Sequence, residues 1–313
     1  MKILFTADWH LKLGQKNVPK AWQENRFKLL FEKLHDLEED VDVVIIGGDI
    51  FDKLPSLEEI KLFMEYISGC TKETLIYDGN HEATRKGRTF LTFLADIIHM
   101  INPKVTILDG VTIRDDLDMD IIPYTHLKSF KPEDFHNLYL CTHVRGEIPP
   151  HVKPEIDLEK LSKWKIVLAG DLHAYSNCQG NILYPGSPVT TSFHRKNVET
   201  GVIIFETHTG EHDWISLELP QLIRKTVESE EEMIATDFDH TIYEITGDVL
   251  DLAKIDTNNS LVDKKIIVRG DSEKTLNLEN LTIQDELALY LKDILDLTPD
   301  KVDKVMRVFN DYI

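Results

Sequence analysis

The sequence contains few cysteines and no long hydrophobic run. Its 313 residues include three cysteines, Cys70, Cys141 and Cys178, which are widely spaced and form no CxxC pair. Neither a disulfide framework nor a zinc-thiolate site is therefore expected. No apolar stretch approaches the roughly 18 residues of a membrane-spanning helix, and the opening residues reach Asp8 too early for a secretory signal. We therefore expect a cytoplasmic protein with no membrane contact.

Basic residues are also scarce. The chain has 35 lysines and arginines against 55 acidic residues, for a formal net charge of -20. Binding to phosphates normally needs local Lys and Arg, so this balance at first argues against a nucleic-acid-binding protein. From Gln221 to the end there are 11 basic and 21 acidic residues, so half of the acidic excess lies in the last third of the chain. Net charge affects solubility and long-range steering but does not determine what a single cleft can bind, so a nucleic-acid substrate is not excluded.

Strands and helices alternate through the first half of the sequence. Short apolar runs rich in β-branched residues predict buried strands, at residues 2–7, 41–48, 73–80, 138–143 and 165–171. Apolar residues at helical spacing predict a helix between the first two strands, and Ser56 with Glu59 forms a capping box at the start of another. After Pro185 the pattern becomes strand-like. This order predicts a layered α/β sandwich of two mixed sheets.

The last third of the chain has a different organisation. We place a domain boundary near Pro220, so that residues 1–220 form the main domain and residues 221–275 a small α+β domain with two candidate strands. The acidic run from Glu228 to Met233 predicts the start of a solvated helix. Residues 276–313 are expected to form a pair of amphipathic helices, the second beginning with Thr298 as its cap and Pro299 as its first residue.

Each of the five predicted strands ends in side chains that commonly bind metals. They are Asp8, His10, Asp49, Asp52, Asn80, His81, His143, Asp171 and His173. The carboxyl ends of strands in an α/β sheet converge on one crevice, so these side chains are expected to meet. Two divalent cations about 3.5–4 Å apart can bind a phosphate ester and lower the pKa of a water. Ligation by Asp, Asn and His without thiolates favours manganese (Mn²⁺), with Fe²⁺ and Mg²⁺ as alternatives.

These motifs resemble those of a known family. D-x-H, G-D-x-x-D, G-N-H-[DE], a later histidine and G-x-x-H together form the signature of the calcineurin-like metallophosphoesterases, and here they span residues 8–173. The stretches "GGDIFDKLPS" and "LYPGSPVTTSF", with the chain start "MKILFTADWHL", are similar to the SbcD-like DNA-repair nucleases of bacteria and phages. The resemblance implies a four-layer α/β/β/α sandwich, and a host-cytoplasmic location if a phage encodes the chain.

The resemblance also implies a role for each of the motif residues. The ligands implied for the first ion are Asp8, His10, Asp49 and His173. Those implied for the second ion are Asp49, Asn80, His143 and Asp171. Asp49 would then bridge the two ions. His81 matches the catalytic histidine, which in the family stabilises the transition state or protonates the leaving oxygen.

The sequence departs from the family pattern at two positions. Most nuclease members have aspartate where this chain has Glu82, and we expect the longer side chain to matter only for the orientation of His81. The family usually has G-H-x-H where this chain has Gly170-Asp171-Leu172-His173. Asp171 is therefore either a substituted ligand or the mark of a lost one. A carboxylate is a competent ligand for Mn²⁺ or Mg²⁺, which favours the substituted ligand.

The implied function is that of a two-metal DNA exonuclease and endonuclease in a recombination or repair complex. Its expected partners are DNA, an SbcC-type coiled-coil ATPase bound by the C-terminal helices, and a second copy of the chain. The small domain would orient DNA. Arg85, Lys86 and Arg88 follow His81 and form either a DNA-contacting loop or a solvated turn. The alternatives are a protein phosphatase or small-molecule phosphodiesterase of the same fold, and a catalytically silent scaffold.

Overall fold

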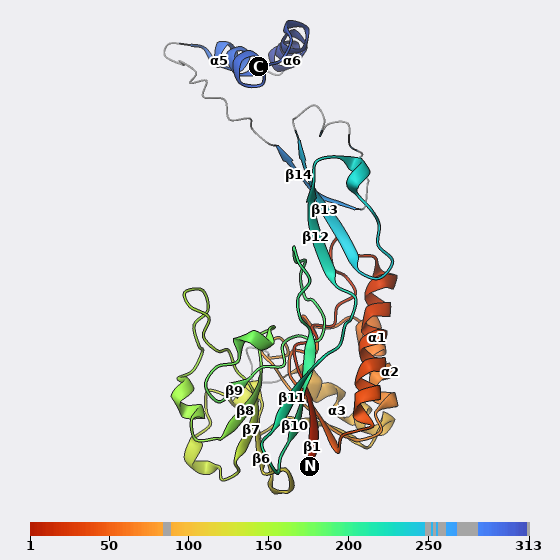
Figure 1. The fold of residues 1–313 in the computed structure, drawn as a ribbon, viewed down its shortest axis with the longest axis vertical. Coiled ribbons are helices and arrows are strands. Elements are labelled where there is room, and N and C mark those ends of the chain that lie inside the picture. The colour runs from red at the N-terminus through yellow and green to blue at the C-terminus, as the bar shows by residue number, and fades with distance from the viewer. Residues whose placement is uncertain (84–88, 248–251, 253–254, 256–260, 268–280, 312–313) are drawn as a thin grey trace.

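The structure is a computed structural model that describes the chain except for residues 84–88, 248–251, 253–254, 256–260, 268–280 and 312–313. Figure 1 shows two large sheets packed together at one end, a small sheet beyond them, and a helical pair at the far end. The predicted Arg85, Lys86 and Arg88 loop lies outside the described residues. Among the residues that are described, no helix is both long enough and apolar enough to cross a bilayer.

The first sheet has six strands in the order β11-β10-β1-β2-β3-β4. Their bounds are β1 Lys2–Thr6, β2 Val43–Gly47, β3 Glu73–Tyr77, β4 Val105–Leu108, β10 Gly201–Glu206 and β11 His212–Ser216. Strands β1 to β4 run parallel, and β10 pairs antiparallel with both β1 and β11. β2 is buried along its whole length, as expected for a strand covered on both faces. The three parallel strands predicted in this sheet are confirmed, although each is shorter than the apolar run that predicted it.

Three helices cover one face of this sheet: α1 Lys20–Glu38, α2 Leu57–Gly69 and α3 Phe90–Ile101. Phe27, Leu30 and Phe31 of α1 pack with Val44 and Ile46 of β2 in one buried cluster. The predicted capping box at the start of α2 is present, since Ser56 Oγ accepts from the Glu59 N–H and the Glu59 carboxylate accepts from the Ser56 N–H. The helices therefore hold β1, β2 and β3 in place, and with them the sheet edge at which these strands end.

The second sheet packs face to face against the first. Its order is β5-β6-β7-β8-β9, with β5 Thr112–Arg114, β6 Met119–Ile122, β7 Tyr139–His143, β8 Ile166–Gly170 and β9 Ile182–Leu183. β6 to β9 run parallel. Phe5 and Ile45 of the first sheet share a buried cluster with Ile121, Cys141 and Leu168 of the second. The outer face is covered by loops and short 3₁₀ turns, so the fourth layer of the confirmed sandwich contains no long helix among the described residues.

A third sheet of three parallel strands follows: β12 Leu222–Val227, β13 His240–Gly247 and β14 Val262–Ile267. The run from Glu228 to Met233 forms a single 3₁₀ turn at 230–232 rather than the start of a helix. Ser229 caps that turn, but its three glutamates are exposed and offer no apolar face to pack. The predicted helix there is therefore wrong.

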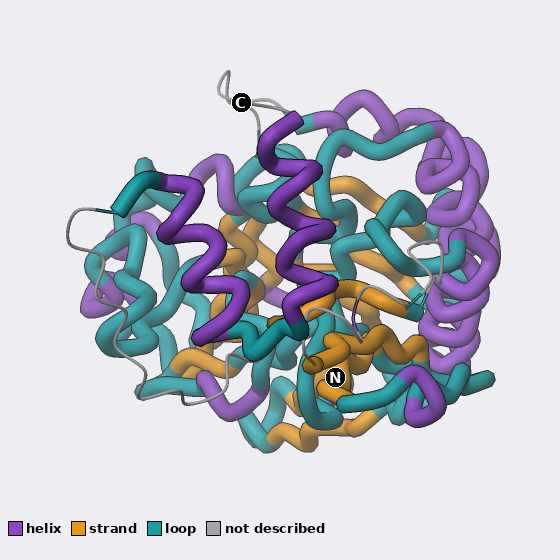
Figure 2. The backbone as a smooth tube through the Cα atoms, turned by 90° about the horizontal axis from the view of Figure 1, so that it is seen from above, coloured by secondary structure: helices purple, strands orange, loops and turns teal. Residues whose placement is uncertain are grey.

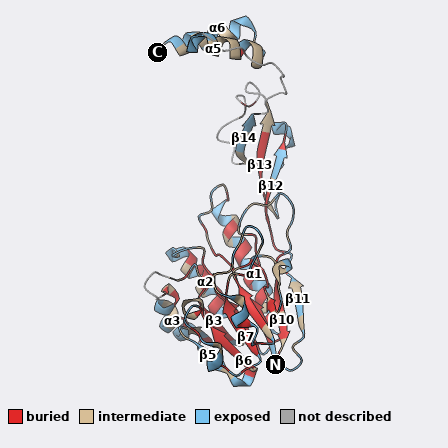
Figure 3. Ribbon diagram, turned by 90° about the vertical axis from the view of Figure 1, so that its left-hand side faces the viewer, coloured by how far each residue is buried: buried red, intermediate tan, exposed pale blue. Residues whose placement is uncertain are grey.

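The chain ends in two helices that lie side by side (Figure 2). α5 spans Ile283–Leu289 and continues as a π-helical turn at Tyr290–Ile294, and α6 spans Pro299–Asp311. Thr298 accepts the first helical hydrogen bonds of α6, from Lys301 and Val302. Figure 3 shows that burial is concentrated in the two large sheets, whereas the helical pair is mostly exposed or half-buried.

Candidate metal centre

The side chains predicted at the strand ends meet at one edge of the two packed sheets. β1 delivers Asp8 and His10, and β2 delivers Asp49. These three loop residues, and Asp171 after β8, have positive φ: 57° at Asp8, 45° at His10, 51° at Asp49 and 102° at Asp171. Left-handed backbone at non-glycine residues is costly and clusters at functional sites. The loops are therefore bent to aim these side chains at a common point.

Asp49 lies at the centre of the cluster. Its Oδ2 is 3.7 Å from His10 Nε2, 3.6 Å from His143 Nε2 and 3.8 Å from His81 Nε2. These distances are too long for hydrogen bonds. Two ligands that each lie about 2.1 Å from one ion are separated by roughly 3–4 Å, which is the spacing seen here. Asp49 Oδ2 therefore has three histidine nitrogens within 4 Å.

His10 and His173 form the other close pair. Their Nε2 atoms are 3.0 Å apart, the separation of two ligands at right angles around one ion. In the part of the chain that the structure describes, the buried His10 Nδ1 has no hydrogen-bond partner. Burial, with the nearby His173 and His81, lowers the pKa of His10 to about 2, so this ring is neutral and able to bind a metal.

The carboxylates of the cluster are buried as well. Asp8 is fully buried and Asp49 is 2% exposed. Burial raises the pKa of Asp8 well above its usual value, although His143 acts in the opposite direction. Buried carboxylates without a cation are unfavourable, and Asp8, Asp49 and His143 offer three ligand atoms within 4.8 Å of one another. The residues present therefore fit divalent cations.

Hydrogen bonds to the protein backbone fix which nitrogen each histidine presents. His143 Nδ1 lies 2.9 Å from the Gly47 carbonyl oxygen, and His81 Nδ1 lies 2.5 Å from that of Asp52. A ring that donates from Nδ1 presents Nε2 to the site, as is usual for metal-binding histidines. One terminal atom of the Asn80 amide is 2.9 Å from His143 Nε2. All eight predicted catalytic and ligand residues are thus brought together.

Asp171 occupies a particular position among them. Its backbone N–H lies 3.1 Å from both carboxylate oxygens of Asp8, and its own Oδ1 is 3.9 Å from His143 Nε2. Its carboxylate accepts two hydrogen bonds from Arg145, at 3.0 Å from Nε and 3.2 Å from Nη2. Sequence reasoning missed Arg145. The signal available was its place two residues after His143, at the end of a strand.

The family model for "Calcineurin-like phosphoesterase" matches residues 1–212. The chain belongs to this family. Phosphoesterases of this family use divalent metal ions, which agrees with the clustered ligand side chains.

Two curated proteins are similar to this phosphoesterase. "Probable exonuclease subunit 1" of Escherichia phage T5 is 42% identical over 323 residues, which cover 100% of this chain and 99% of that protein. The SbcD component of the SbcCD nuclease of Staphylococcus epidermidis is 34% identical over 92 residues, which cover 28% of this chain and 24% of that protein. Among solved structures, an archaeal phosphodiesterase covers 69% of this chain at 17% identity, with 99% of its own chain aligned and a TM-score of 0.38.

Glu82 supports the ligand loops of this phosphoesterase from behind. It is 1% exposed, and its Oε2 accepts from the N–H groups of Asp49 (2.8 Å) and Gly79 (2.9 Å), while Oε1 accepts from that of Phe51 (3.0 Å). Burial, with the Asp49 charge, raises the pKa of Glu82 to about 7. We expected from the sequence that Glu82 would matter only for the orientation of His81. In the structure its carboxylate instead binds backbone N–H groups of the loops after β2 and β3.

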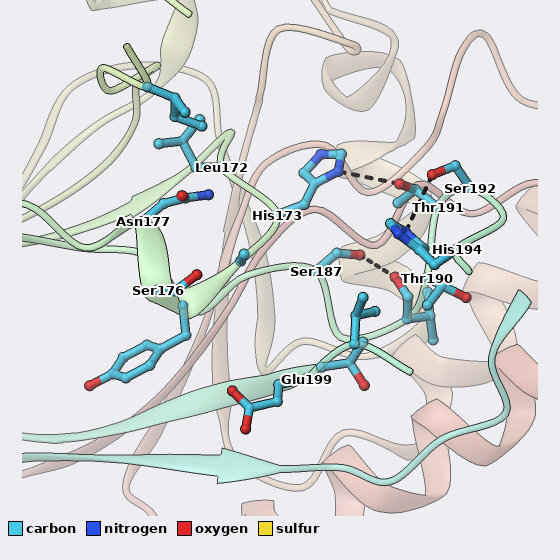
Figure 4. Close-up of a pocket in the computed structure, with 16 residues that line it drawn as sticks. Leu172, His173, Ser176, Asn177, Ser187, Thr190, Thr191, Ser192, His194 and Glu199 are labelled. Carbon is cyan, nitrogen blue, oxygen red and sulfur yellow. Dashed lines mark hydrogen bonds between the residues drawn. The ribbon is translucent and has the colours of Figure 1, made fainter. Parts of the chain in front are cut away.

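A cavity of about 460 Å³ opens beside His173. Its walls come from the loop after β8 and from residues 187–200, and they carry the hydroxyl groups of Ser176, Thr191 and Ser192 (Figure 4). Thr191 Oγ1 lies 3.3 Å from His173 Nδ1, so the cavity and the ligand cluster share a wall. The walls also carry apolar side chains, among them Leu172, Val189 and Val198, so the cavity offers a ligand both apolar surface and hydroxyl groups that can donate and accept hydrogen bonds.

Proposed function

We propose that the chain is the nuclease subunit of an SbcCD-like recombination or repair complex, and that it hydrolyses DNA phosphodiester bonds as an exonuclease and endonuclease in the cytoplasm. The observation that carries this proposal is the convergence of eight ligand-type and catalytic side chains from five strand ends. Full-length similarity to a probable phage exonuclease subunit supports DNA as the substrate.

We assign the ligands of two ions, most consistent with Mn²⁺, as follows. Those of the first are Asp8, His10, Asp49 and His173, and those of the second are Asp49, Asn80, His143 and Asp171. Divalent ions in such a site supply Lewis acidity and a water of lowered pKa. Asp49 fits the bridging role because its Oδ2 has histidine nitrogens from both groups within 4 Å.

His81 is assigned the proton transfer. Its Nδ1 contact with the Asp52 carbonyl fixes the ring, and its side chain is 36% exposed, so Nε2 can meet a substrate. In the protonated state, Nε2 would donate to the leaving oxygen as the phosphodiester bond breaks. The cavity beside His173 is a suitable place for the nucleotide next to the cleaved phosphate, because its walls offer hydroxyl groups and little charge.

The other domains are assigned to partners. Residues 221–275, with the three parallel strands, would orient DNA. We assign residues 276–313 to the coiled coil of an SbcC-type ATPase. The described helices of this segment, α5 and α6, have a groove of about 720 Å³ between them, lined by residues that include Leu289, Leu297 and Val302.

We assign the contact with a second copy of the chain to a surface on α3. Phe93, Ile97, Met100 and Ile101 form an exposed apolar stripe on this helix, and Phe93 and Met100 are 71% and 84% exposed. A contiguous exposed apolar face marks an interaction site. Because the stripe carries no charge, it can pack against its own copy across a two-fold axis.

The test is DNA cleavage with a matched control. End-labelled duplex DNA is incubated with Mn²⁺ and the protein, alone and with a candidate ATPase, and the same is done with His81→Ala and His136→Ala. His136 is an exposed histidine whose partner is Asp115, outside the ligand cluster. We expect cleavage by the wild type and His136→Ala and its loss in His81→Ala. Turnover of p-nitrophenyl phosphate without DNA cleavage would favour the phosphatase alternative, and no turnover of either substrate would favour the silent scaffold.

A further inference from the structure

Asp171 and Arg145 form an ion pair at the place where the family pattern has a neutral histidine. The pair is bidentate, with Arg145 Nε 3.0 Å and Nη2 3.2 Å from the two oxygens of Asp171. The Asp171 side chain is 6% exposed and that of Arg145 is 42% exposed. A planar guanidinium held by two parallel bonds fixes the orientation of its carboxylate more firmly than a single contact could.

The environment explains why a cation is needed there. Asp171 adds a third buried carboxylate next to Asp8 and Asp49, and its N–H is already bonded to the oxygens of Asp8. Three carboxylates repel one another in a poorly solvated site. Arg145 compensates for the charge of Asp171, so that the pair is neutral overall, as a histidine would be at the same position.

The backbone around Arg145 is itself held in place. Its N–H donates to Glu155 Oε1 at 3.2 Å, and Glu155 Oε2 accepts from the Tyr124 hydroxyl at 2.9 Å. The guanidinium is therefore presented from an anchored loop after β7 rather than from a free surface position.

We propose that Arg145 is a positioning residue that makes Asp171 a working replacement for the family's histidine. This inference rests on the proposed assignment of Asp171 to the second ion. An ionised carboxylate has about four lone-pair sites, so Asp171 can accept from Arg145 and still bind an ion. Partners that hydrogen-bond to a metal ligand typically change metal affinity roughly 10- to 100-fold when they are removed. Arg145 should therefore matter when residue 171 is aspartate and matter little when it is histidine.

The experiment is a double-mutant cycle read by metal binding. Mn²⁺ affinity and stoichiometry are measured by calorimetry and by electron paramagnetic resonance of free Mn²⁺, without DNA, for wild type, Arg145→Gln, Asp171→His and the double variant. We expect two ions in the wild type, a roughly 10-fold or greater loss of affinity for the second ion in Arg145→Gln, and less than about threefold loss when the same change is made in Asp171→His.

Two further variants keep the result interpretable. Arg145→Lys keeps the charge without the fork and should fall between the wild type and Arg145→Gln. Arg114→Gln removes a bidentate arginine that pairs with Glu73 and Asp116 away from the site, and it should leave Mn²⁺ binding unchanged. Circular dichroism in EDTA checks that each variant is folded.

Three outcomes would overturn the inference. The first is that the wild type binds a single ion. The second is that Arg145→Gln lowers the Mn²⁺ affinity equally in the wild type and in Asp171→His. The third is that Arg145→Gln binds the second ion more tightly than the wild type, which would mean that Arg145 withholds Asp171 from the metal. Because no DNA is present, the nuclease proposal can fail while this coupling is found, and the coupling can be absent from a working nuclease.

Discussion

Glu82 provides a direct test of how the ligand loops are held. Its buried carboxylate accepts three hydrogen bonds, from the backbone N–H groups of Asp49, Phe51 and Gly79. In Glu82→Gln one oxygen becomes an amide NH₂ group. The best orientation keeps the remaining oxygen on Asp49 and Gly79 and turns the NH₂ group toward the N–H of Phe51. That leaves the Phe51 N–H and the new NH₂ group facing each other without an acceptor, which costs about 1–3 kcal/mol, part of which is offset because the substitution also removes a buried charge.

Glu82→Ala should be more damaging. It removes both acceptor oxygens, so that three backbone N–H groups lose their partner, and it leaves a cavity, for a loss of roughly 3–6 kcal/mol if water partly restores the bonds. Since a folded domain is stable by about 5–15 kcal/mol in total, the alanine variant should lie near the limit of folding.

The assay is urea unfolding followed by circular dichroism, with EDTA present so that metal binding does not contribute to the midpoint. We expect the midpoints to fall in the order wild type, Glu82→Gln, Glu82→Ala. Glu32→Ala on the exposed side of α1 serves as the control and should remain near the wild type. Equal midpoints for the wild type and both Glu82 variants would refute the reasoning.

Three further predictions concern other parts of the molecule. Burial would raise the pKa of Glu38, but hydrogen bonds from His35 and from backbone N–H groups lower it overall. The ionised carboxylate therefore stabilises the fold above pH 4.5, and this stabilisation disappears as the pH falls through the lowered folded-state pKa. Glu38→Gln should be less stable than the wild type at pH 7 by urea unfolding, and the difference should vanish in acid. Burial raises the pKa of the Cys70 thiol to about 12, leaving roughly one thiolate in ten thousand at pH 8, so mass spectrometry should find iodoacetamide on the half-buried Cys178 well before Cys70, and equal rates would contradict this. Phe93→Glu places a charge in the α3 stripe and should reduce a dimer to a monomer in analytical ultracentrifugation; an unchanged mass would rule out this interface.

The ligand cluster could be predicted from the sequence because its chemistry follows a simple rule of topology. Asp8, Asp49 and His143 each end a buried strand, and the structure confirms that these strands run parallel in sheets that pack together. Parallel strands end at the same edge, so residue type and position at the strand end were sufficient to bring the side chains together. The same strand pattern predicted the α/β sandwich.

The supporting contacts could not be predicted in the same way. Arg145 meets Asp171 across 26 residues, and Glu82 reaches the backbone of Phe51 across 31 residues. Such contacts depend on side-chain direction and loop path rather than on local pattern. Local pattern also misled at 228–233, where an acidic run predicted the start of a solvated helix that has no apolar face to bury. An acidic run is compatible with the first turn of a helix, but packing decides whether the helix continues.

The acidic character of the chain and its proposed substrate are connected through the metal centre. Asp8, Asp49 and Asp171 place three buried carboxylates at the point where the proposed phosphodiester substrate would bind, and Arg145 compensates for only one of them. Two divalent cations would change the local charge from negative to positive, so the attraction for phosphate at this point arises from the ions rather than from lysines and arginines. A net charge of -20 is then compatible with a DNA substrate, because net charge describes the chain as a whole, whereas the loaded centre would set the charge at the point where the phosphate binds.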